Sequence, residues 1–472
     1  MQPLIQQSLS IVYQPNDTIV ALATPAGNGA IAVIRVSGSK SLTIVDDCFS
    51  PKGKTKISEA KTHTLVFGDI KDGDEIVDEV LVSIFKNPRS YTGEDSIEIS
   101  CHGSTYIQGR IIDLLVRKGC RLAQPGEFTM RAYMNKKMDL SQAEAVADLI
   151  ASSSAAAHQV ALNQMRGGFS DDLKTLRQKL IDFASLIELE LDFAEEDVEF
   201  ADRAELTSLI NQINVRIIEL IGSFKLGNVI KEGVQVAILG EPNAGKSTLL
   251  NALLNEERAI VSHIAGTTRD TIEDEVVIEG LKFRFIDTAG LRETSDEIES
   301  LGISRALNKA DNADIIIYLF DAEQTSAERL KTELAKLKER TLEIEAKLLV
   351  VANKVDKLAS GDKTQFSNES VISISAKNGD HIDHVRQALI ARVNTDSLKK
   401  EQTIVTNIRH VEALSNTKQS LDEALVGFEN DIPSDLVSID IKKALFHLGE
   451  ITGEISSDDL LGNIFGKFCI GK

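Results

Sequence analysis

The chain lacks the features that mark membrane proteins, secreted proteins and disulfide-stapled proteins. Its 472 residues include only four cysteines, which lie far apart at positions 48, 101, 120 and 469. No two of them have the spacing of metal ligands, so reduced thiols in a cytoplasmic protein are the simplest interpretation. No run of about 18 apolar residues occurs, and the N-terminal stretch has no basic segment followed by an apolar core. We therefore expect neither a membrane helix nor a signal peptide.

Positive charge is also scarce. The chain has 52 Lys and Arg residues against 72 Asp and Glu residues, which gives a formal net charge of −20. This excess of acid argues against a generic, charge-driven nucleic-acid binder, because contacts with phosphates need clustered Lys and Arg. RNA held by a local basic patch or by a partner protein stays open.

The eight prolines are unevenly spread and mark out the first domain. Six of them precede residue 136. Between them lie short β-rich runs, separated by turn signals and one helical pattern. The runs are at 18–23, 30–36, 80–85 and 96–100, and the helical pattern is at 104–118. These patterns predict a compact α+β domain over residues 1–135.

The remaining sequence predicts a helical domain that is interrupted by an α/β domain. A proline-free, Ala-rich stretch over 139–225 predicts long helices, starting at a capping box formed by Ser141 and Glu144. Buried-strand runs then alternate with helical stretches, which indicates a sheet dominated by parallel strands. They lie at 234–240, 282–287, 314–320, 347–353 and 371–375. Helices are expected again over 401–430 and 434–449, so the four predicted segments are 1–135, 136–228, 229–397 and 398–472.

A phosphate-binding loop opens the α/β domain. Residues 240–247 match the pattern GxxxxGK[ST], and they lie between a predicted strand and a predicted helix. Backbone amides of such a loop surround phosphate oxygens, a lysine reaches the β- and γ-phosphates, and a hydroxyl binds Mg²⁺. The candidate binding residues are Asn243, Ala244, Gly245, Lys246, Ser247 and Thr248, with Lys246 as the lysine and Ser247 as the magnesium ligand.

Three further motifs follow in the order typical of guanine-nucleotide-binding proteins. Residues 266–270 (GTTRD) offer a switch threonine for Mg²⁺, and residues 287–290 (DTAG) offer an aspartate and a glycine for the γ-phosphate side. Residues 353–356 (NKVD) end a predicted strand, and Ser375, Ala376 and Lys377 complete the base pocket. The carboxylate of Asp356 can accept two hydrogen bonds from guanine, whereas adenine would leave it unpaired. The ordered set predicts a GTPase that uses GTP and Mg²⁺.

The group that assists hydrolysis is less evident. Ras-like GTPases place a water-orienting glutamine directly after the third motif, but this position holds Leu291. Glu299 is a candidate replacement, although composition alone favours an exposed glutamate on a helix. Asn243, within the loop, could help to hold a monovalent cation that replaces an arginine finger.

Five segments together resemble one family, the bacterial tRNA-modification GTPases called MnmE or TrmE. The segments are 23–35 (ATPAGNGAIAVIR), 91–95 (YTGED), 125–132 (PGEFTMRA), 264–270 (IAGTTRD) and the terminal CIGK at 469–472. The resemblance spans nearly the whole chain. It implies a homodimer that works with an FAD-containing flavoprotein of the MnmG or GidA type, in a heterotetrameric or larger complex. Together they would modify the 5-position of the wobble uridine, U34, in certain tRNAs.

The resemblance also implies two groups of site residues. The one-carbon unit would come from a 5-formyl- or methylene-tetrahydrofolate, and the matching folate-contacting positions are Arg35, Glu98, Lys137 and Lys472. A potassium site would use Asn243, Ser262, Ile264 and Thr267, while Ser247 and Thr268 would bind Mg²⁺. The family's catalytic glutamate matches Glu299, with Lys246 and Arg269 also at catalytic positions. The nucleotide-binding set further includes His263, Ala265, Gly266, Asp287, Thr288, Ala289, Gly290, Asn353 and Lys354.

Some alternatives remain open on the sequence. A lipidation box at Cys469 fits poorly because of the terminal lysine. The alternatives for Cys469 are a buried structural thiol and the functional thiol near the folate site that the resemblance implies. A ribosome-assembly GTPase would carry a KH-type RNA module, and a membrane-remodelling GTPase would carry a basic amphipathic helix. We find neither pattern, so the sequence favours the tRNA-modifying GTPase.

Overall fold

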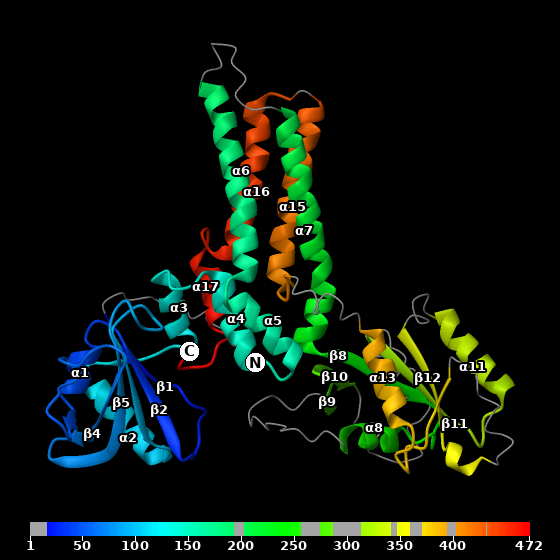
Figure 1. Cartoon of the computed structure of the whole chain (residues 1–472), viewed down its shortest axis with the longest axis horizontal. Coiled ribbons are helices and arrows are strands. Elements are labelled where there is room, and N and C mark those ends of the chain that lie inside the picture. Colours follow the sequence, from blue (N-terminus) through cyan, green and yellow to red (C-terminus); the bar gives the residue numbers. More distant parts are fainter. Residues whose placement is uncertain are drawn as a thin grey trace, which may run out of the picture. The chain divides into compact units, whose positions relative to one another are not determined.

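The computed structural model describes residues 17–192, 203–255, 274–286, 313–340, 347–358, 371–393, 403–430 and 432–472. The chain divides into two compact units. The first combines Met1–Ala147, Asn163–Asn214 and Ala413–Lys472, and the second combines Asp148–Leu162 and Val215–Glu412. Each unit is therefore assembled from segments that lie far apart in the sequence (Figure 1).

The N-terminal part of the first unit is a seven-stranded sheet in the order β3-β4-β5-β6-β2-β1-β7. Its strands are β1 (Ile19–Leu22), β2 (Ile31–Ser37), β3 (Phe49–Pro51), β4 (Thr64–Asp72), β5 (Glu75–Phe85), β6 (Ser96–His102) and β7 (Arg121–Leu122). Neighbouring strands run antiparallel, except that β1 and β7 are parallel. Helices α1 (Ser41–Asp46) and α2 (Thr105–Arg117) pack on it. All four β-rich runs and the helical pattern predicted in this region are confirmed.

Alternation along the strands gives this sheet two different faces. On β2, Ala32, Ile34 and Val36 are buried in the core, whereas Arg35 between them points to the opposite face. The register places Arg35 opposite Glu98 of β6. Because side chains alternate between the two faces of a strand, the hydrophobic core lies on one face of the sheet and the Arg35–Glu98 pair on the other.

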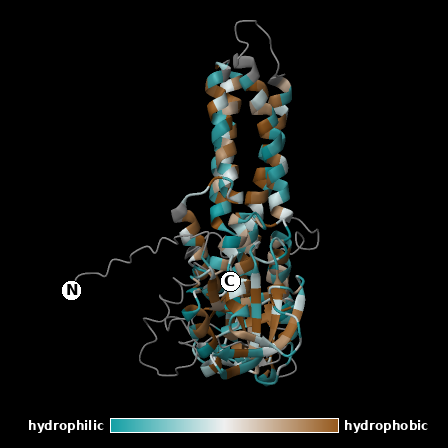
Figure 2. Ribbon diagram, turned by 90° about the vertical axis from the view of Figure 1, so that its left-hand side faces the viewer, coloured by the Kyte–Doolittle hydropathy of each residue, from teal (hydrophilic) through white to brown (hydrophobic). Residues whose placement is uncertain are grey.

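Long helices form the rest of the first unit and extend into the second. They are α3 (Glu127–Met134), α4 (Leu140–Ala151), α5 (Ala155–Met165), α6 (Gly168–Asp192), α7 (Arg203–Glu232), α15 (Ile408–Glu429), α16 (Ser434–Thr452) and α17 (Asp458–Phe465). Helix α16 packs along α6, where Arg177 forms an ion pair with Glu454 at 2.6 Å. Hydrophobic and hydrophilic residues recur along the long helices, as expected for amphipathic helices that bury one stripe (Figure 2).

The predicted capping box of α4 is wrong by two residues. The side chain of Asp139 accepts a hydrogen bond from the Gln142 amide at 3.0 Å, and the Gln142 side chain accepts one from the Asp139 amide at 2.9 Å. Ser141 instead donates to Asp139. Asp and Gln satisfy the same two orphan amides that a Ser and Glu pair would, and the helix begins directly after Asp139.

The second unit contains a six-stranded sheet in the order β13-β12-β11-β8-β10-β9. The strands are β8 (Val234–Gly240), β9 (Asp274–Ile278), β10 (Leu281–Phe285), β11 (Ile315–Asp321), β12 (Leu348–Asn353) and β13 (Val371–Ser373), with α8 (Lys246–Asn255), α11 (Ala327–Arg340) and α13 (Ile382–Arg392). All pairs are parallel except β9 with β10. The parallel-dominated sheet is confirmed, while β9 was not predicted.

The helix predicted from residue 401 begins only at Ile408. Residues 403–407 form neither helix nor strand, and the Val405 amide donates to the Ser223 hydroxyl of α7 at 3.0 Å. Ile404 is buried against Val160 and Ile230. This tertiary packing overrides the helical pattern of the segment. Among the described helices, none is both long enough and apolar enough to cross a membrane.

Candidate functional site

The phosphate-binding loop connects β8 to α8 in the second unit. Gly245 has a φ of +95°, and a Cβ atom at this position would lie 2.4 Å from the side-chain nitrogen of Asn353. Only glycine satisfies both constraints. The Lys246 ammonium donates to the carbonyl of Gly240 at 2.7 Å and to that of Glu241 at 3.3 Å, so it lies against the loop. The helix that follows directs its N-terminal amides toward the same loop, which favours an anion there.

The base motif is fastened directly to this loop. The Asn353 side chain donates to the Ala244 carbonyl at 2.8 Å and accepts from the amides of Lys354 and Ala376 at 2.8 and 2.9 Å. Asn353 is almost fully buried. One amide side chain therefore joins three segments that the sequence assigns to phosphate and base recognition.

Lys354 makes a second link, through a residue that sequence reasoning missed. Its ammonium donates to the Asn243 carbonyl at 2.7 Å and pairs with the Asp321 carboxylate at 2.8 Å. Asp321 ends β11 and is buried. Its signal in the sequence was its place at the end of a buried parallel strand, because such strand ends meet at one edge of the sheet.

The environment of Asp356 keeps its carboxylate charged. A hydrogen bond from the Ser375 hydroxyl is the largest influence that lowers the pKa of Asp356, and the charges of Lys357 and Lys377 act in the same direction. An ionised carboxylate at neutral pH can accept hydrogen bonds from two donors on one ligand edge. Ser375, Lys377 and Asp356 thus come together as the motif spacing predicts.

The remaining predicted nucleotide and cation residues lie outside the described part of the chain. They are Ser262, His263, Ile264, Ala265, Gly266, Thr267, Thr268, Arg269, Asp287, Thr288, Ala289, Gly290 and Glu299. Their roles stay predictions.

A second site forms on the open face of the N-terminal sheet, in the first unit. The Arg35 guanidinium pairs with Glu98 at 2.8 Å, and both side chains are largely buried. The aromatic rings of Tyr91 and Phe128 lie near the guanidinium, with centroids 5.4 and 5.6 Å from its central carbon. The two rings hold the charged group in place through cation–π contacts. Tyr91 belongs to the segment 91–95, whose contribution to this site sequence reasoning missed.

The C-terminal tail closes this site. The Gly471 carbonyl accepts from Arg35 at 3.3 Å, and the Lys472 carbonyl accepts from the Phe128 amide at 3.2 Å. Gly471 has a φ of +97°, and a Cβ atom there would lie 2.2 Å from the Leu22 carbonyl oxygen. The tail is anchored by Phe465 and Phe468, which pack against Met130 and Leu140. We call Arg35, Glu98, Tyr91 and residues 469–472 the tail site.

Two of the motifs that carried the resemblance meet beside the tail site. Arg131, which is fully buried, pairs with Glu94 at 3.2 Å, and the hydroxyls of Tyr91 and Thr129 lie 2.8 Å apart. Segments 91–95 and 125–132 are therefore held against each other. This contact fixes the position of the Tyr91 ring over Arg35.

The four predicted folate residues are only partly gathered. Arg35 and Glu98 form a pair, and Lys472 is close enough for their charges to act on its ammonium. Burial is the main influence that lowers the pKa of Lys472, and the charge of Arg35 adds to it. The exposed Lys137 donates instead to the Pro88 carbonyl at 3.0 Å. The Cys469 thiol is exposed, so its interpretation as a buried structural thiol is wrong.

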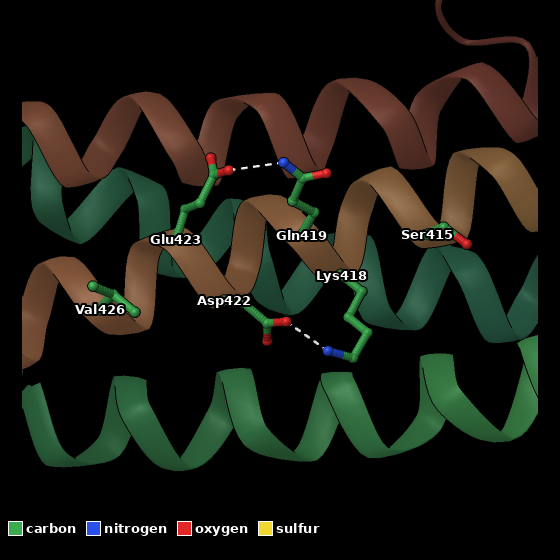
Figure 3. A pocket seen from close by; sticks show the side chains of 6 residues that line it. All are labelled: Ser415, Lys418, Gln419, Asp422, Glu423 and Val426. Carbon is green, nitrogen blue, oxygen red and sulfur yellow. Dashed lines mark hydrogen bonds and ion pairs between the residues drawn. The ribbon is translucent and has the colours of Figure 1, made fainter.

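A hollow along α15 lies away from both sites. A shallow pocket of about 490 Å³ runs along α15 and is lined by Ser415, Lys418, Gln419, Asp422, Glu423 and Val426 (Figure 3). Its charged and amide groups already pair along the helix, Lys418 with Asp422 and Gln419 with Glu423. We assign it no chemistry, because one helix face with satisfied pairs offers no convergent polar groups.

Two family models together match most of the chain. Residues 18–137 match the family model of the GTP-binding protein TrmE N-terminus, and residues 140–469 match that of the MnmE helical domain. Proteins named tRNA modification GTPase MnmE are similar over nearly their whole length. The protein from Flavobacterium psychrophilum is 55% identical, covering 97% of this chain and 99% of the relative. The one from Bacteroides fragilis strain YCH46 is 53% identical, covering 97% and 99%.

Two solved GTP-binding proteins are similar to part of the chain. The G domain of the FeoB iron transporter from T. maritima is 23% identical, with a TM-score of 0.25, and covers 34% of this chain and 99% of its own. A GTP-binding protein from Sulfolobus solfataricus, solved with GDP, is 20% identical with a TM-score of 0.25, covering 47% and 67%. The family models and the near-full-length relatives establish that the chain belongs to the MnmE (TrmE) family of tRNA modification GTPases.

Proposed function

We propose that this tRNA modification GTPase works with a flavoprotein partner to modify the 5-position of wobble uridine in tRNA, using a one-carbon unit carried by tetrahydrofolate. The observation that carries the proposal is the tail site. A charged pair, an aromatic ring and the end of the chain converge on one face of the N-terminal sheet. The same chain also holds a phosphate-binding loop clamped to a guanine-type motif.

The proposed folate contacts follow from charge. Arg35 and Lys472 can pair with the carboxylates of a folate, and Glu98 can accept hydrogen bonds from the pterin. The lowered pKa of Lys472 supports this role, because a buried ammonium beside a guanidinium gains from an anionic partner. Lys137 approaches the loop that carries Tyr91 by packing against Gly93. It would join the ligand from that side.

The proposed nucleotide is GTP with Mg²⁺. Lys246 would move from the loop carbonyls to the β- and γ-phosphates, and Ser247 with Thr268 would hold Mg²⁺, with Asp287 reaching it through water. The arrangement of Asn353, Lys354 and Asp356 supports selection of guanine, since the base motif and the loop form one hydrogen-bonded unit. Glu299, with Arg269 near the phosphates, completes the proposed catalytic set.

We include a potassium ion at Asn243, Ser262, Ile264 and Thr267 in the proposal. Asn243 has a φ of +58°, and its carbonyl is held by Lys354. A residue fixed in this way can offer its side chain as a rigid ligand beside the phosphates. GTP hydrolysis should then be much faster in K⁺ than in Na⁺ at equal ionic strength, because the smaller ion fits the cage poorly. Equal turnover in the two salts would rule out this part of the proposal.

An apolar strip on the face of the sheet that carries Arg35 and Glu98 supports dimerisation through the N-terminal domain. Leu65, Phe67 and Leu81 are 67%, 48% and 45% exposed, and Phe67 lies opposite Leu81 in the register of β4 and β5. Contiguous exposed apolar residues on a strand pair are typical of an interface. A homodimer would cover them.

A contact within the second unit supports coupling between GTP hydrolysis and the helical domain. The Gly280 carbonyl, in the turn between β9 and β10, accepts from the Ala156 amide at 3.1 Å in the first turn of α5. In the sequence, β9 follows the GTTRD segment and β10 precedes the DTAG segment. A shift of either segment would therefore reach α5.

The proposal also includes association of the two G domains of a dimer when GTP and K⁺ bind.

The same proposal includes a cytoplasmic location and a heterotetrameric or larger complex with the flavoprotein. It also includes the domain limits 1–135, 136–228, 229–397 and 398–472. The decisive experiment is mass spectrometry of wobble nucleosides in tRNA from cells lacking this protein. We expect 5-substituted wobble uridines to disappear and to return with the wild-type gene but not with Lys246→Ala. Unchanged nucleosides in the deletion strain would overturn the proposal.

A further inference from the structure

Three segments of the first unit concentrate positive charge on a chain whose net charge is −20. Residues 52–61, 86–89 and 136–137 contain eight Lys and Arg residues but a single acidic residue, Glu59. Such a concentration is unusual in an acidic chain, and it creates a local positive potential that the total charge conceals.

Two hydrogen bonds connect the three segments. The Lys86 ammonium donates to the Ser58 carbonyl at 2.8 Å, which connects the second segment with the first. The Lys137 ammonium donates to the Pro88 carbonyl at 3.0 Å, which connects the third with the second. The three basic segments are therefore neighbours in space, although they come from separate parts of the sequence.

Five of these side chains are exposed and form no ion pair within the described part of the chain. They are Lys54, Lys56, Lys61, Arg89 and Lys136, and we call them the basic rim. Lys52 differs, because Asp69 and Glu79 pair with it at 2.8 and 3.1 Å. No acidic side chain of the described residues neutralises the charges of the rim.

The segment that carries three of the rim lysines is held in place rather than free. The Asp46 carboxylate accepts from the amides of Ile57 and Ser58 at 2.8 and 3.0 Å, and Ile57 is fully buried in the core of the domain. A groove of about 550 Å³ separates this segment from β4, with Lys61 and Thr55 among its lining residues. Preorganised cations beside a groove with a hydroxyl suit phosphate oxygens.

We propose that the basic rim binds the sugar-phosphate backbone of the tRNA substrate. The inference rests on the proposed function, of which it names one contact surface. A membrane of anionic lipids is disfavoured, because Ile57 and Ala60 are buried, and the exposed Leu65 and Phe67 on the other side of the groove belong to the apolar strip that the proposed homodimer would cover. Charge alone is enough for RNA, whose phosphates supply a regular row of negative partners.

The test uses the full-length chain without nucleotide and a fluorescently labelled transcript of a tRNA with U34. Binding is followed by anisotropy between 50 and 300 mM salt, in wild type and in Lys54→Gln/Lys56→Gln/Lys61→Gln. The control variant, Lys179→Gln/Lys225→Gln/Lys331→Gln, removes the same total charge from scattered, exposed lysines that form no ion pair with any described residue. The rim variant should bind on the order of 10²-fold more weakly at ~0.1 M salt, with its salt slope lowered by about 2 to 3. The control should bind like wild type.

GTP hydrolysis should be the same in all three proteins. A rim variant with wild-type affinity and salt slope would overturn the inference, as would equal losses in rim and control variants or a wild type without measurable tRNA affinity. Rim-dependent sedimentation of the wild type with phosphatidylserine vesicles, without binding of tRNA, would overturn it in favour of a membrane. Analysis of wobble nucleosides distinguishes failure of the proposed function from failure of the rim assignment. If modification is lost on deletion of the gene but the rim variant binds tRNA normally, only the rim assignment fails.

Discussion

The nucleotide site and the tail site differ in how the chain assembles them. In the nucleotide site, the contacting groups come from short motifs at the ends of neighbouring parallel strands, so that Asn353 reaches the loop at Ala244. In the tail site, Arg35 contacts the carbonyl of a residue 436 positions away. The comparison teaches that a contiguous motif can be recognised from the sequence, whereas a site closed by a distant segment needs the fold. It also predicts that the two sites fail independently.

The largest effect should follow from Lys246→Ala. The variant loses two charge-assisted contacts with phosphates, each worth about 1.5–3 kcal/mol, so GTP affinity should fall about 10²- to 10⁴-fold. Folate affinity should stay at the wild-type level, since the tail site shares no residue with the loop. Calorimetry with GTP and with 5-formyltetrahydrofolate measures both. The exposed Lys331 supplies the control, Lys331→Ala, and a parallel loss of folate binding in Lys246→Ala would break the comparison.

A smaller effect, confined to turnover, is expected from Glu299→Ala. Loss of a group that polarises or positions water lowers kcat by about 10²-fold while GTP affinity is nearly kept, because the interaction forms only in the transition state. Steady-state hydrolysis and nucleotide titration separate the two quantities. Glu429→Ala, at an exposed position of α15, is the matched control. An unchanged kcat would restore the interpretation of Glu299 as an ordinary surface glutamate.

Deletion of residues 469–472 should affect only the tail site. The variant loses the Gly471 carbonyl that Arg35 contacts and the ammonium of Lys472. Removing one charge-assisted contact, worth about 1.5–3 kcal/mol, should weaken binding of 5-formyltetrahydrofolate at least about tenfold. GTP hydrolysis should persist. Lys467→Ala, an exposed lysine just before the tail, should bind folate normally; full folate affinity after the deletion would remove the tail from the pocket.

The smallest expected effect is a pH dependence of folate binding. Burial lowers the pKa of Lys472, so this ammonium loses its proton at a pH where an ordinary lysine is still charged. A folate carboxylate needs the protonated form. Affinity should therefore decline a few-fold as the pH rises through the lowered pKa. Lys472→Arg stays charged over this range and should flatten the profile; equal slopes in both proteins would separate Lys472 from the ligand.

Several features of the fold were predictable because they depend on local pattern. The strand β8 and the loop after it follow from a buried run and a glycine-rich motif, and the core of the first sheet follows from alternation along β2 and β6. The cap of α4 shows the limit of this reasoning. Two polar residues near the helix start were chemically equivalent candidates, and only the backbone geometry assigned the cap to Asp139.

The features that escaped prediction depend on distant contacts. In the sequence, nothing distinguishes Asp321 from other polar residues at the ends of buried strands. Only the structure shows that its carboxylate pairs with the Lys354 ammonium. Residues 403–407 carry a helical pattern but form no helix, because Ile404 is buried instead against Val160 of α5 and Ile230 of α7. The basic rim is likewise invisible in a net charge of −20, since contacts between three separate segments bring its lysines together.

By itself, the sequence determined which nucleotide-binding motifs this protein carries: a phosphate-binding loop and a carboxylate suited to guanine. These follow from residue type and short spacing, which a polypeptide cannot change on folding, whereas the charged residues suited to a folate were expected only from the family resemblance. Only the tertiary structure decided which charges meet. The Gly471 carbonyl accepts a hydrogen bond from Arg35, because the burial of Phe465 and Phe468 directs the tail to the N-terminal sheet. Lys137, in contrast, donates to the Pro88 carbonyl.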